Sequence, residues 1–476
     1  MAYIYGNRYQ STMFPESIED YVSKDDPVRA YDAFVETLDL KELGVDIEEV
    51  KVGNPAYNPK AMIKLIVYGC SYGVRSSRKL ERACNHNISF MWLMEGLKPD
   101  HKTIAEARRN YKEPLKNILK QCAKLCIKLD LIEGNTLFVD GSKIRANASI
   151  NNTFTKERAE TLLTDIDKRI QQILDECDTI DEKEQNNPSL VKLKAELKDT
   201  NKLKTKVEQI MKELTNTNKE KINSTDPECV NVHGRQGTHA GYNGQIVVDE
   251  KHGIIVNSDV VAACNDRNQF SEQIEQANKT LETKCKNACA DAGYANIKEL
   301  KKVDEQSINV IVPSQEQISE ARGEQFNKDH FKYDYKNNSY ICPKGEVLKH
   351  IKKDDRNSSD IYMITDKALC HTCVHFGVCT KSRDGRTIRR NFDEAIMKQL
   401  EANYKKQESQ AIFSLRKQKV ELPFGHMKRN LGINAFLLKG LAGVKAEMSI
   451  FSTCFNIARM ITIFGVAGFI EKLATV

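Results

Sequence analysis

Two short apolar segments that each end on an aspartate constrain the fold of this chain more than any other feature. Leu137-Phe138-Val139 leads into Asp140, and Ala288-Cys289-Ala290 leads into Asp291. Runs of this length are too short for a helix and are typical of buried strands. An aspartate followed by glycine, as at Asp140, can simply be a turn residue. That interpretation weakens only if a second acid lies nearby in space.

The elements around the two aspartates predict that they do meet. A β-hairpin is expected at residues 244–264. A helix at 268–283 follows, then the run before Asp291, a further helix and a strand at 308–313. This order predicts a mixed α/β fold in which helices cover the faces of one sheet. Since the carboxyl ends of neighbouring strands come together in such sheets, Asp140 and Asp291 should lie close to each other.

Two carboxylates held close together repel each other, and a divalent cation removes that repulsion. Oxygen-only ligands favour Mg²⁺ or Mn²⁺ over zinc. A third acid would complete a two-metal site, in which cations about 3.5–4 Å apart activate water and stabilise the leaving oxygen of a phosphodiester. The best third acid is Glu421, which lies in a basic and predicted helical stretch at 414–432.

The residues predicted to share a helix face with Glu421 are cationic. Lys417 and Lys428 lie four and seven positions away, so all three side chains should line one side of the helix. Pro423 is expected to kink that helix. A surface ion pair is the alternative for Glu421, because a single glutamate among basic residues usually forms one.

Positive charge is concentrated in two parts of the chain, although the net charge is only +6. Between Lys60 and Lys128 there are fifteen Lys or Arg against five Asp or Glu, and between Lys381 and Asn430 there are thirteen against six. Such zones favour a polyanion as the partner. Long helices with basic solvated faces are the alternative, and neither zone alone decides between the two.

Residues 1–130 are predicted to be helical. Asn58-Pro59 should begin one helix, Ser77 a second, and Asp100 a third that covers residues 101–129. Several short helices with one long basic member are compatible with a DNA reader of the helix-turn-helix kind. An all-α bundle without a partner is the alternative.

Residues 154–222 are rich in Lys, Glu, Asp and Asn and carry apolar residues at steps of three and four. The apolar stripes are Leu162, Ile166, Ile170, Ile173, Cys177 and Ile180, then Leu190, Leu193, Leu197, Leu203, Val207, Ile210 and Leu214. This spacing predicts a helical hairpin with a narrow apolar seam and a turn at 186–188. The change of phase between Leu197 and Leu203 argues against a long regular coiled coil. The hairpin is expected to pack on itself, on DNA or on a second subunit.

Fourteen cysteines in a chain without an apparent signal peptide indicate a reducing compartment. The most apolar segment, 451–470, is interrupted by Asn456 and Arg459. Its uninterrupted part is too short to span a bilayer. We therefore expect a buried helix and no membrane contact.

Four of the cysteines are candidate metal ligands: Cys342, Cys370, Cys373 and Cys379. Cys-x-x-Cys is half of a common zinc pattern, and four thiolates would complete a closed tetrahedral structural site. The spacing of the other two cysteines is irregular, and His371 or His375 could replace one thiolate. We expect structural zinc, with unliganded thiols as the alternative.

Three blocks of the sequence together resemble the catalytic blocks of bacterial insertion-sequence transposases of the DDE class. They are FVDGSKIRANAS at 138–149, ADAGYAN at 290–296 and VELPFGHMKRNLG at 420–432. Parts of 58–109 are also similar to the helical domain that precedes the core in one branch of these elements. The resemblance covers most of the chain apart from the hairpin. It implies an RNase H-like core and a cysteine-bearing insert between the last strand and the helix that carries the glutamate.

The resemblance also assigns roles by position. Asp140, Asp291 and Glu421 match the metal-binding triad of the family, and Lys428 matches the lysine of its Tyr-Arg-Glu-Lys signature. The signature arginine corresponds either to Arg416, one residue further from the glutamate than usual, or to Lys417, which has the usual spacing. No tyrosine stands at the expected place, where Phe413 and Ser414 are found.

The function implied is that of a DNA transposase. Such an enzyme binds the terminal inverted repeats of its element, hydrolyses a phosphodiester with Mg²⁺ or Mn²⁺, and joins the freed 3′ end to target DNA. Lys143 and Arg145 would then touch the phosphate backbone beside Asp140. The expected partners are double-stranded DNA and at least one further copy of the chain, in the cytoplasm at the nucleoid. The alternatives are a transposase-derived DNA-binding protein that no longer cuts, and an RNase H-like nuclease that cuts without joining.

The predicted domains follow the same division. They are a helical DNA-binding domain at 1–130, the first part of the RNase H-like core at 131–153 and 223–313, the helical-hairpin insertion at 154–222, the Cys-rich insert at 314–390, and the C-terminal helices with the catalytic glutamate at 391–476.

Overall fold

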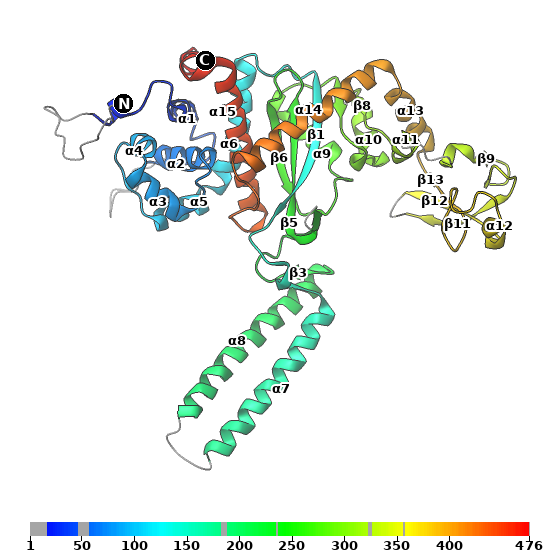
Figure 1. Ribbon diagram of the computed structural model, residues 1–476, viewed down its shortest axis with the longest axis horizontal. Coiled ribbons are helices and arrows are strands. Elements are labelled where there is room, and N and C mark those ends of the chain that lie inside the picture. Colours follow the sequence, from blue (N-terminus) through cyan, green and yellow to red (C-terminus); the bar gives the residue numbers. More distant parts are fainter. Residues whose placement is uncertain are drawn as a thin grey trace, which may run out of the picture.

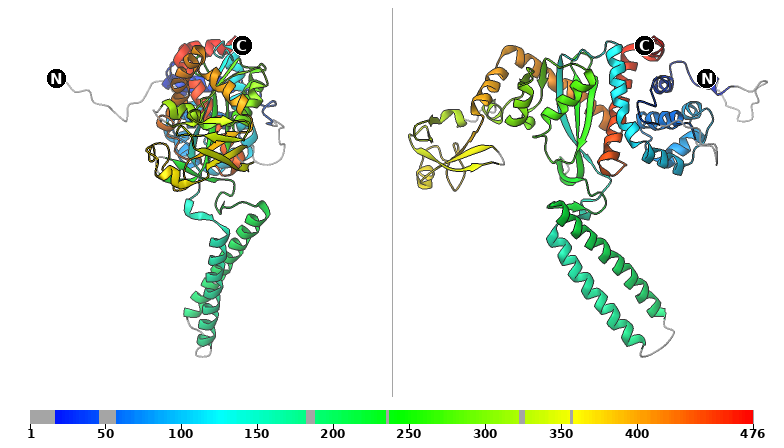
Figure 2. Two further views of the ribbon diagram at one scale, coloured as in Figure 1. Left: turned by 90° about the vertical axis from the view of Figure 1, so that its right-hand side faces the viewer. Right: turned by 180° about the vertical axis from the view of Figure 1, so that it is seen from behind.

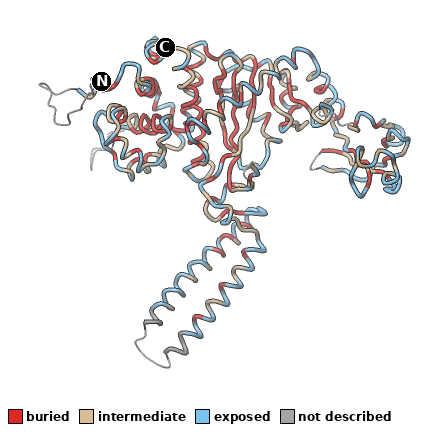
Figure 3. Tube along the Cα trace, in the orientation of Figure 1, coloured by how far each residue is buried: buried red, intermediate tan, exposed pale blue. Residues whose placement is uncertain are grey.

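The computed structural model shows a central body with smaller parts attached to it (Figure 1). It describes residues 17–45, 57–181, 188–234, 237–321, 326–355 and 358–475. A sheet with helices on its faces forms the body, short helices lie on one side of it, and a small sheet lies on the other. A long helical hairpin projects away from the rest in every view (Figure 2). Buried residues concentrate in the body, whereas the hairpin is largely exposed (Figure 3).

The central sheet is mixed, as the sequence predicts. Its strands are β1 (Thr136–Arg145), β4 (Val230–Gly234), β5 (Gly237–Asp249), β6 (Ile255–Val261), β7 (Asn287–Cys289) and β8 (Asn309–Ile311). β5 pairs antiparallel with β1, β4 and β6, whereas β1, β7 and β8 run parallel. The predicted hairpin is β5–β6. The two aspartate-terminated runs are neighbouring parallel strands, with Phe138 of β1 opposite Cys289 of β7.

Helices cover the faces of this sheet. They are α9 (Phe270–Leu281), α10 (Ile297–Asp304), α11 (Gln315–Ala321), α13 (Glu394–Tyr404), α14 (Gln407–Arg429) and α15 (Gly440–Ala474). α9 packs on β5 and β6, and Asn257 of β6 donates hydrogen bonds to Gln273 and Gln276 of α9 at 3.1 and 3.2 Å. α14 crosses β1, β5 and β7 and continues as one helix through Pro423 (Figure 1).

α15 contains the buried helix that the apolar segment predicts. Residues 446–457 are all buried, and the helix packs on β6 and on three N-terminal helices. Beyond Met460 it is more exposed, and its backbone leaves the helical conformation at Gly465, where φ is 72°. By length and composition alone, α15 could cross a membrane, and no second helix of the described ranges could. A core helix of a folded domain meets the same criterion, and the burial of its first half fits that description.

The N-terminal helices are α1 (Pro27–Glu36), α2 (Pro59–Ser71), α3 (Ser77–His86), α4 (Ile88–Leu93), α5 (His101–Asn110) and α6 (Lys112–Lys128). Asn58 and Asp100 cap α2 and α5 as predicted, because their side chains accept hydrogen bonds from the first backbone N–H groups of these helices. The prediction that Ser77 caps α3 was wrong by one residue, since Ser76 is the N-cap.

The single helix expected over 101–129 was also wrong, because the chain forms α5 and α6 with a break at Tyr111. Pro114 explains the break. Proline lacks a backbone N–H, and in a continuous helix its ring would clash with the carbonyl of Asn110. It is tolerated in the first turn of α6, where N–H groups have no partner within the helix.

The helical hairpin consists of α7 (Lys156–Asp181) and α8 (Pro188–Thr217), and a short antiparallel pair, β2 (Thr153–Phe154) and β3 (Ile222–Asn223), closes its base. The apolar seam is present: Ile166 and Val207 belong to its buried cluster, and Ile173 is buried as well. Leu203, predicted to be part of it, is 44% exposed. α8 is continuous, so the change of phase turns Leu203 outward. The predicted turn and the side chains of Cys177, Ile180 and Leu190 lie outside the described residues.

The small sheet is antiparallel and lies between α11 and α13 in the sequence. Its strands are β9 (Lys332–Asp334), β10 (Ser339–Ile341), β11 (Val347–Asp354), β12 (Ser359–Ile364) and β13 (Thr387–Asn391), and α12 (Lys367–His371) follows β12. Its core is small: Phe331, Tyr340, Leu348, Tyr362, Ile364 and Ile388. Charged residues form the junction with the body, where Lys328 and Glu394 make a buried ion pair of 2.5 Å.

Glu316 of α11 lies at the same junction. Its Oε2 is buried and has no hydrogen-bond partner in the described structure. Burial raises the pKa of Glu316 to about 7, although Lys328 lowers it, and Glu401 raises it further. The carboxyl is therefore under electrostatic strain once it ionises.

Glu316→Gln is expected to raise the thermal midpoint at pH 8 by about 2–4 °C and to leave it unchanged at pH 5. The folded-state pKa lies above the ordinary value of 4.5, so the folded protein binds the extra proton between those values and stability falls as pH rises through about 7. Glutamine mimics the protonated form. Thermal unfolding at both pH values is the measurement, with Glu320→Gln, exposed on the same helix, as the control. Equal shifts at both pH values would contradict this cause.

Candidate functional site

Asp140 and Asp291 lie together in the sheet, joined by Arg416 of α14. Asp140 belongs to β1. Asp291 follows β7 and caps a short 3-10 helix, η3 (Ala292–Tyr294), where its Oδ1 accepts a hydrogen bond of 2.8 Å from the backbone N–H of Gly293. Arg416 Nη1 lies 3.2 Å from Asp140 Oδ1, and Arg416 Nη2 lies 3.7 Å from Asp291 Oδ2. The structure thus brings the two aspartates together, as the strand arrangement predicts.

The environment of Asp140 disfavours its ionised form. Its side chain is 19% exposed, against 44% for Asp291. Burial raises the pKa of Asp140 to about 6, Arg416 lowers it, and the nearby Asp291 raises it. A positive charge between the two carboxylates therefore stabilises the ionised pair. Arg416 supplies that charge in this structure.

Glu421 does not join this pair in the structure. Its side chain is exposed and, with Lys417, lines a shallow depression on α14. Arg416, which points at the aspartates, lies five positions away, so Glu421 lies on a different face of the helix. The side chain of Lys417, offered with Arg416 for the arginine position, is also on this exposed face. Arg416 is the residue that the structure brings to the aspartates.

Lys428 of α14 reaches β1 on the side of Asp140. Its Nζ donates a hydrogen bond of 2.5 Å to Oγ of Ser142, two residues beyond Asp140 and so on the same face of the strand. Arg145 is exposed at the end of β1, and its backbone carbonyl accepts from Phe436 N at 2.9 Å. Lys428 thus reaches the face of β1 that carries Asp140, whereas Arg145, five positions beyond Asp140, projects from the opposite face of the strand.

Lys143 lies on the opposite face of β1, which the sequence argument overlooked. Alternate residues of a strand face opposite sides, so Lys143 points away from Asp140 and Ser142. Its Nζ lies 3.2 and 3.3 Å from the two carboxylate oxygens of Asp266. The prediction that Lys143 touches the phosphate backbone beside Asp140 is therefore not what this structure shows.

Asp266 is the acidic residue that the sequence argument missed. It lies in the loop between β6 and α9, at the end of the apolar run Val260-Val261-Ala262-Ala263-Cys264. An apolar strand followed by an aspartate is the signal that identified Asp140 and Asp291. This aspartate was not identified from the sequence because Asn265 separates it from the apolar run and because it lies outside the three transposase-like blocks.

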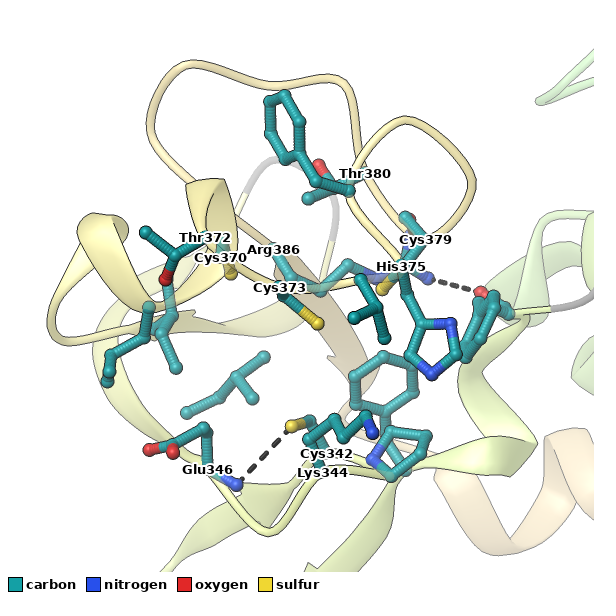
Figure 4. Close-up of a pocket in the computed structure, with 18 residues that line it drawn as sticks. Cys342, Lys344, Glu346, Cys370, Thr372, Cys373, His375, Cys379, Thr380 and Arg386 are labelled. Atoms are coloured by element: carbon teal, nitrogen blue, oxygen red, sulfur yellow. Dashed lines mark hydrogen bonds between the residues drawn. The ribbon is translucent and has the colours of Figure 1, made fainter.

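The cysteines of the small sheet line one pocket (Figure 4). Cys342 lies in a tight turn after β10, where its Sγ accepts from the backbone N–H of Glu346 at 3.3 Å. Cys370, Cys373 and Cys379 come from α12 and the loop after it, and the picture shows all four thiols turned toward one cavity of about 390 Å³. His375 lines it as well, whereas His371 does not.

Burial raises the pKa of the Cys379 thiol, Arg386 lowers it, and the other thiols of the cavity raise it further. The thirteen cysteines whose side chains the structure describes, which excludes Cys177, are free thiols. This is compatible with the reducing compartment that the sequence predicts.

Metal fit can be judged from the donor atoms. The carboxylate oxygens of Asp140 and Asp291 are the donors that Mg²⁺ or Mn²⁺ prefers. Within the part of the chain that is described, however, no group of three or more His, Cys, Asp or Glu side chains is close enough to hold a metal ion. The aspartate pair thus supplies two of the three predicted acids, and the thiols would have to move closer to bind zinc.

Comparison with known families identifies two regions of the chain. Residues 16–110 match the family model described as transposase domain (DUF772). Residues 341–461 match the model described as transposase DDE domain. The second match contains the four cysteines and Glu421, whereas Asp140 and Asp291 lie outside both. No curated protein and no solved structure matches the chain significantly.

Proposed function

The chain belongs to the insertion-sequence transposases of the DDE class, enzymes that cut and transfer DNA strands, and we propose that Asp140 and Asp291 form the core of its catalytic site. The observation that carries this proposal is their meeting around Arg416 at neighbouring parallel strands. Glu421 is proposed as the third acid on the resemblance of its block alone. Lys428 and Arg145 are proposed to bind the DNA backbone along β1.

Transposases of this class use divalent metal ions such as Mg²⁺. In this chain Asp140 and Asp291 would hold the metal, which when bound polarises the phosphate and activates water or a 3′ hydroxyl as the nucleophile. Arg416 would remain beside the carboxylates and bind the scissile phosphate through its guanidinium group. Lys417 is the alternative for this role, and its exposed position makes it the weaker one.

We infer that the body is an RNase H-like core. The sheet supports this, because an antiparallel meander, β6-β5-β1, continues into the parallel strands β7 and β8, with acids on the central strand β1 and after its neighbour β7. The hairpin, the small cysteine-bearing sheet and the N-terminal helices are then additions to that core. The domain boundaries predicted from the sequence remain a prediction, and those at 153/154, 222/223 and 390/391 divide the strands β2, β3 and β13.

We propose that the substrates are the terminal inverted repeats of the element and a target duplex, with the enzyme acting as a dimer or larger assembly in the cytoplasm at the nucleoid. Purified protein, an end-bearing duplex, a labelled target and Mg²⁺ test this directly. Cleaved ends joined to target DNA are expected. Cleavage without joined product would favour the nuclease alternative, and specific binding without cleavage would favour the silent DNA-binding protein.

A structural zinc at Cys342, Cys370, Cys373 and Cys379 is part of the proposal. Its support is the shared cavity of the four thiols, one of which, Cys342, accepts an N–H···S hydrogen bond. The small core of this sheet gives a further reason, since a segment with few buried apolar residues gains from a metal. His375 is the substitute ligand that the cavity offers.

Elemental analysis is expected to find one zinc per chain in the intact protein and none in Cys373→Ser. Cleavage should fall severalfold in the variant, because a loosened sheet no longer supports α13 and α14, which follow it in the chain. Cys264→Ser is the matched control, since Cys264 is exposed and far from the four in sequence. Less than half a zinc per intact chain with normal activity would remove zinc from the proposal.

A further inference from the structure

The polar network around Asp266 lies directly behind the aspartate pair, on the opposite face of β1. Asp266 Oδ1 accepts hydrogen bonds from Asn243 at 2.6 Å and Gln245 at 2.8 Å, and Lys143 lies 3.2 Å from the same oxygen. Asn243 and Gln245 belong to β5 and Lys143 to β1. One carboxylate in the loop after β6 thus joins the two central strands through side chains alone.

This network touches β1 at the residue that follows Asp140. Gly141 faces Asp266, and a Cβ at this position would lie 2.5 Å from Asp266 Oδ1 and 2.5 Å from Gln245 Nε2. Real Cβ atoms do not approach other atoms so closely. The backbone of β1 beside Asp140 therefore rests against Asp266 and Gln245, and only glycine allows that contact.

The same network reaches the loop that carries Asp291. The hydroxyl of Tyr294 donates a hydrogen bond of 2.5 Å to Gln245 Oε1. Tyr294 is buried and ends the η3 turn that Asp291 begins. Gly293 lies close to both Asp291 and Asp266. A Cβ atom added at Gly293 would lie 2.8 Å from Asp291 Oδ1 and 4.0 Å from Asp266 Oδ2. A chain of contacts from Asp266 through Gln245 and Tyr294 thus fixes the Asp291 turn.

We propose that Asp266 is a positioning residue of the catalytic site, which sets the spacing of Asp140 and Asp291 from behind the sheet. Asp266 would not be a metal ligand itself, because its contacts lie on the face of β1 opposite to Asp140 and Arg416. Its charge is balanced by Lys143, which gives that lysine a role other than DNA contact. The inference rests on the proposed function, since it concerns the aspartates assigned to the metal.

The expected consequence is a change in metal affinity. Residues that orient metal ligands without touching the metal typically change affinity by about 10–100-fold when they are removed. Asp266→Ala should therefore weaken Mn²⁺ binding to the full-length protein by about tenfold. Asp266→Asn retains an oxygen that can accept from Asn243 and Gln245, so it should restore most of the affinity. Tyr294→Phe should weaken binding in the same direction by removing the link to the Asp291 turn.

Isothermal titration of the intact protein with Mn²⁺, in the absence of DNA, is the test, with thermal unfolding measured on the same samples. Asp226→Asn is the matched control, because Asp226 is a buried aspartate that accepts from a neighbouring side chain, the Tyr242 hydroxyl at 2.8 Å, but contacts neither Asp140 nor Asp291. It should lower the thermal midpoint and leave Mn²⁺ affinity unchanged.

The outcomes separate this inference from the proposed function. Weaker Mn²⁺ binding in Asp266→Ala, recovered in Asp266→Asn and absent from the control, would support a positioning role. Unchanged affinity in Asp266→Ala, beside lost binding in Asp140→Ala, would overturn this inference alone. Mn²⁺ binding that survives Asp140→Ala would overturn the proposed metal site, and this inference with it.

Discussion

Asparagine in place of Asp140 or Asp291 is expected to reduce strand cleavage by at least about 10³-fold. Amide side chains are poor ligands for a hard cation, and the metal is proposed to supply several kcal/mol of charge stabilisation in the transition state, which corresponds to a loss of this size or larger. Binding of element ends should change little, because affinity for DNA rests mainly on phosphate contacts made by cations elsewhere. Cleavage of an end-bearing duplex in Mg²⁺, with end binding measured in parallel, gives both values.

Asp249→Asn is the matched control for this experiment. Asp249 is the last residue of β5 in the central sheet, and burial raises the pKa of its carboxyl as it does for Asp140. Its oxygens accept from the backbone N–H groups of Gly134 and Lys251, and Asp249 lies opposite Leu137 of β1, three residues before Asp140. A loss that reflects weakened folding should appear in this variant too. Cleavage that persists in Asp140→Asn or Asp291→Asn would remove that residue from the site.

Glu421→Gln tests the weaker part of the assignment. The same loss of cleavage is expected if Glu421 completes the site once DNA is bound, although its side chain is exposed on α14 in this structure. Glu408→Gln, exposed in the first turn of the same helix, is the control. Normal cleavage in Glu421→Gln would return this residue to the surface ion pair that its basic surroundings suggest.

The sheet could be predicted from the sequence because strand period and apolar length are local signals. The runs before Asp140 and Asp291 and the hairpin at 244–264 all form strands, but the expected end of the first strand at Asp140 was wrong, because β1 continues to Arg145. Parallel pairing of β1 with β7 then follows from the helix between them. Residues that come into contact from different strands and loops are, however, far apart in the sequence. The contact of Gly141 with Asp266 depends on the path of the loop after β6, which no spacing in the sequence reveals.

The face that a side chain occupies was the least predictable feature of the site. Lys143 was expected beside Asp140 because three positions separate them, but an odd spacing on a strand places two side chains on opposite faces. Arg416 and Lys417 are adjacent, and about 100° of helix rotation decides which of them meets the aspartates. Leu203 shows the same limitation in the hairpin, where one change of phase turns it into solvent. In each case the sequence predicted the correct helix or strand, but the direction of the side chain was predicted wrongly or left open.

The second large effect is expected on DNA affinity, from changes in the N-terminal region that matches the transposase domain model. α3 follows α2 after a short turn, in the order of a helix-turn-helix unit, and packs on α4 and α5. Three of its cations, Arg78, Lys79 and Arg82, are exposed. None of the three has an ion-pair partner within the described ranges. Lys64 of α2, by contrast, is buried and neutralised by Asp32 at 2.5 Å. We propose that α3 is the helix that contacts DNA.

Replacing Arg78, Lys79 and Arg82 together by alanine is expected to weaken end binding by about 100-fold at moderate salt. Each phosphate contact that is lost also removes about 0.9 from the slope of log affinity against log salt, so the slope should fall by about 2 to 3. Cleavage at saturating DNA should be preserved, because α3 lies apart from β1, the strand that contains Asp140 (Figure 1). Binding measured across a salt series gives affinity and slope from one data set.

The control variant removes three positive charges from a different surface of the protein. Lys279, Lys284 and Lys286 are exposed near the amino end of β7, at the opposite end of that strand from Asp291. Their triple alanine variant should keep nearly the full slope if binding depends on where the cations are rather than on net charge. An equal fall in both variants would mean that charge attracts DNA without a defined surface. An unchanged slope in the α3 variant would return these helices to a bundle that supports the core without contacting DNA.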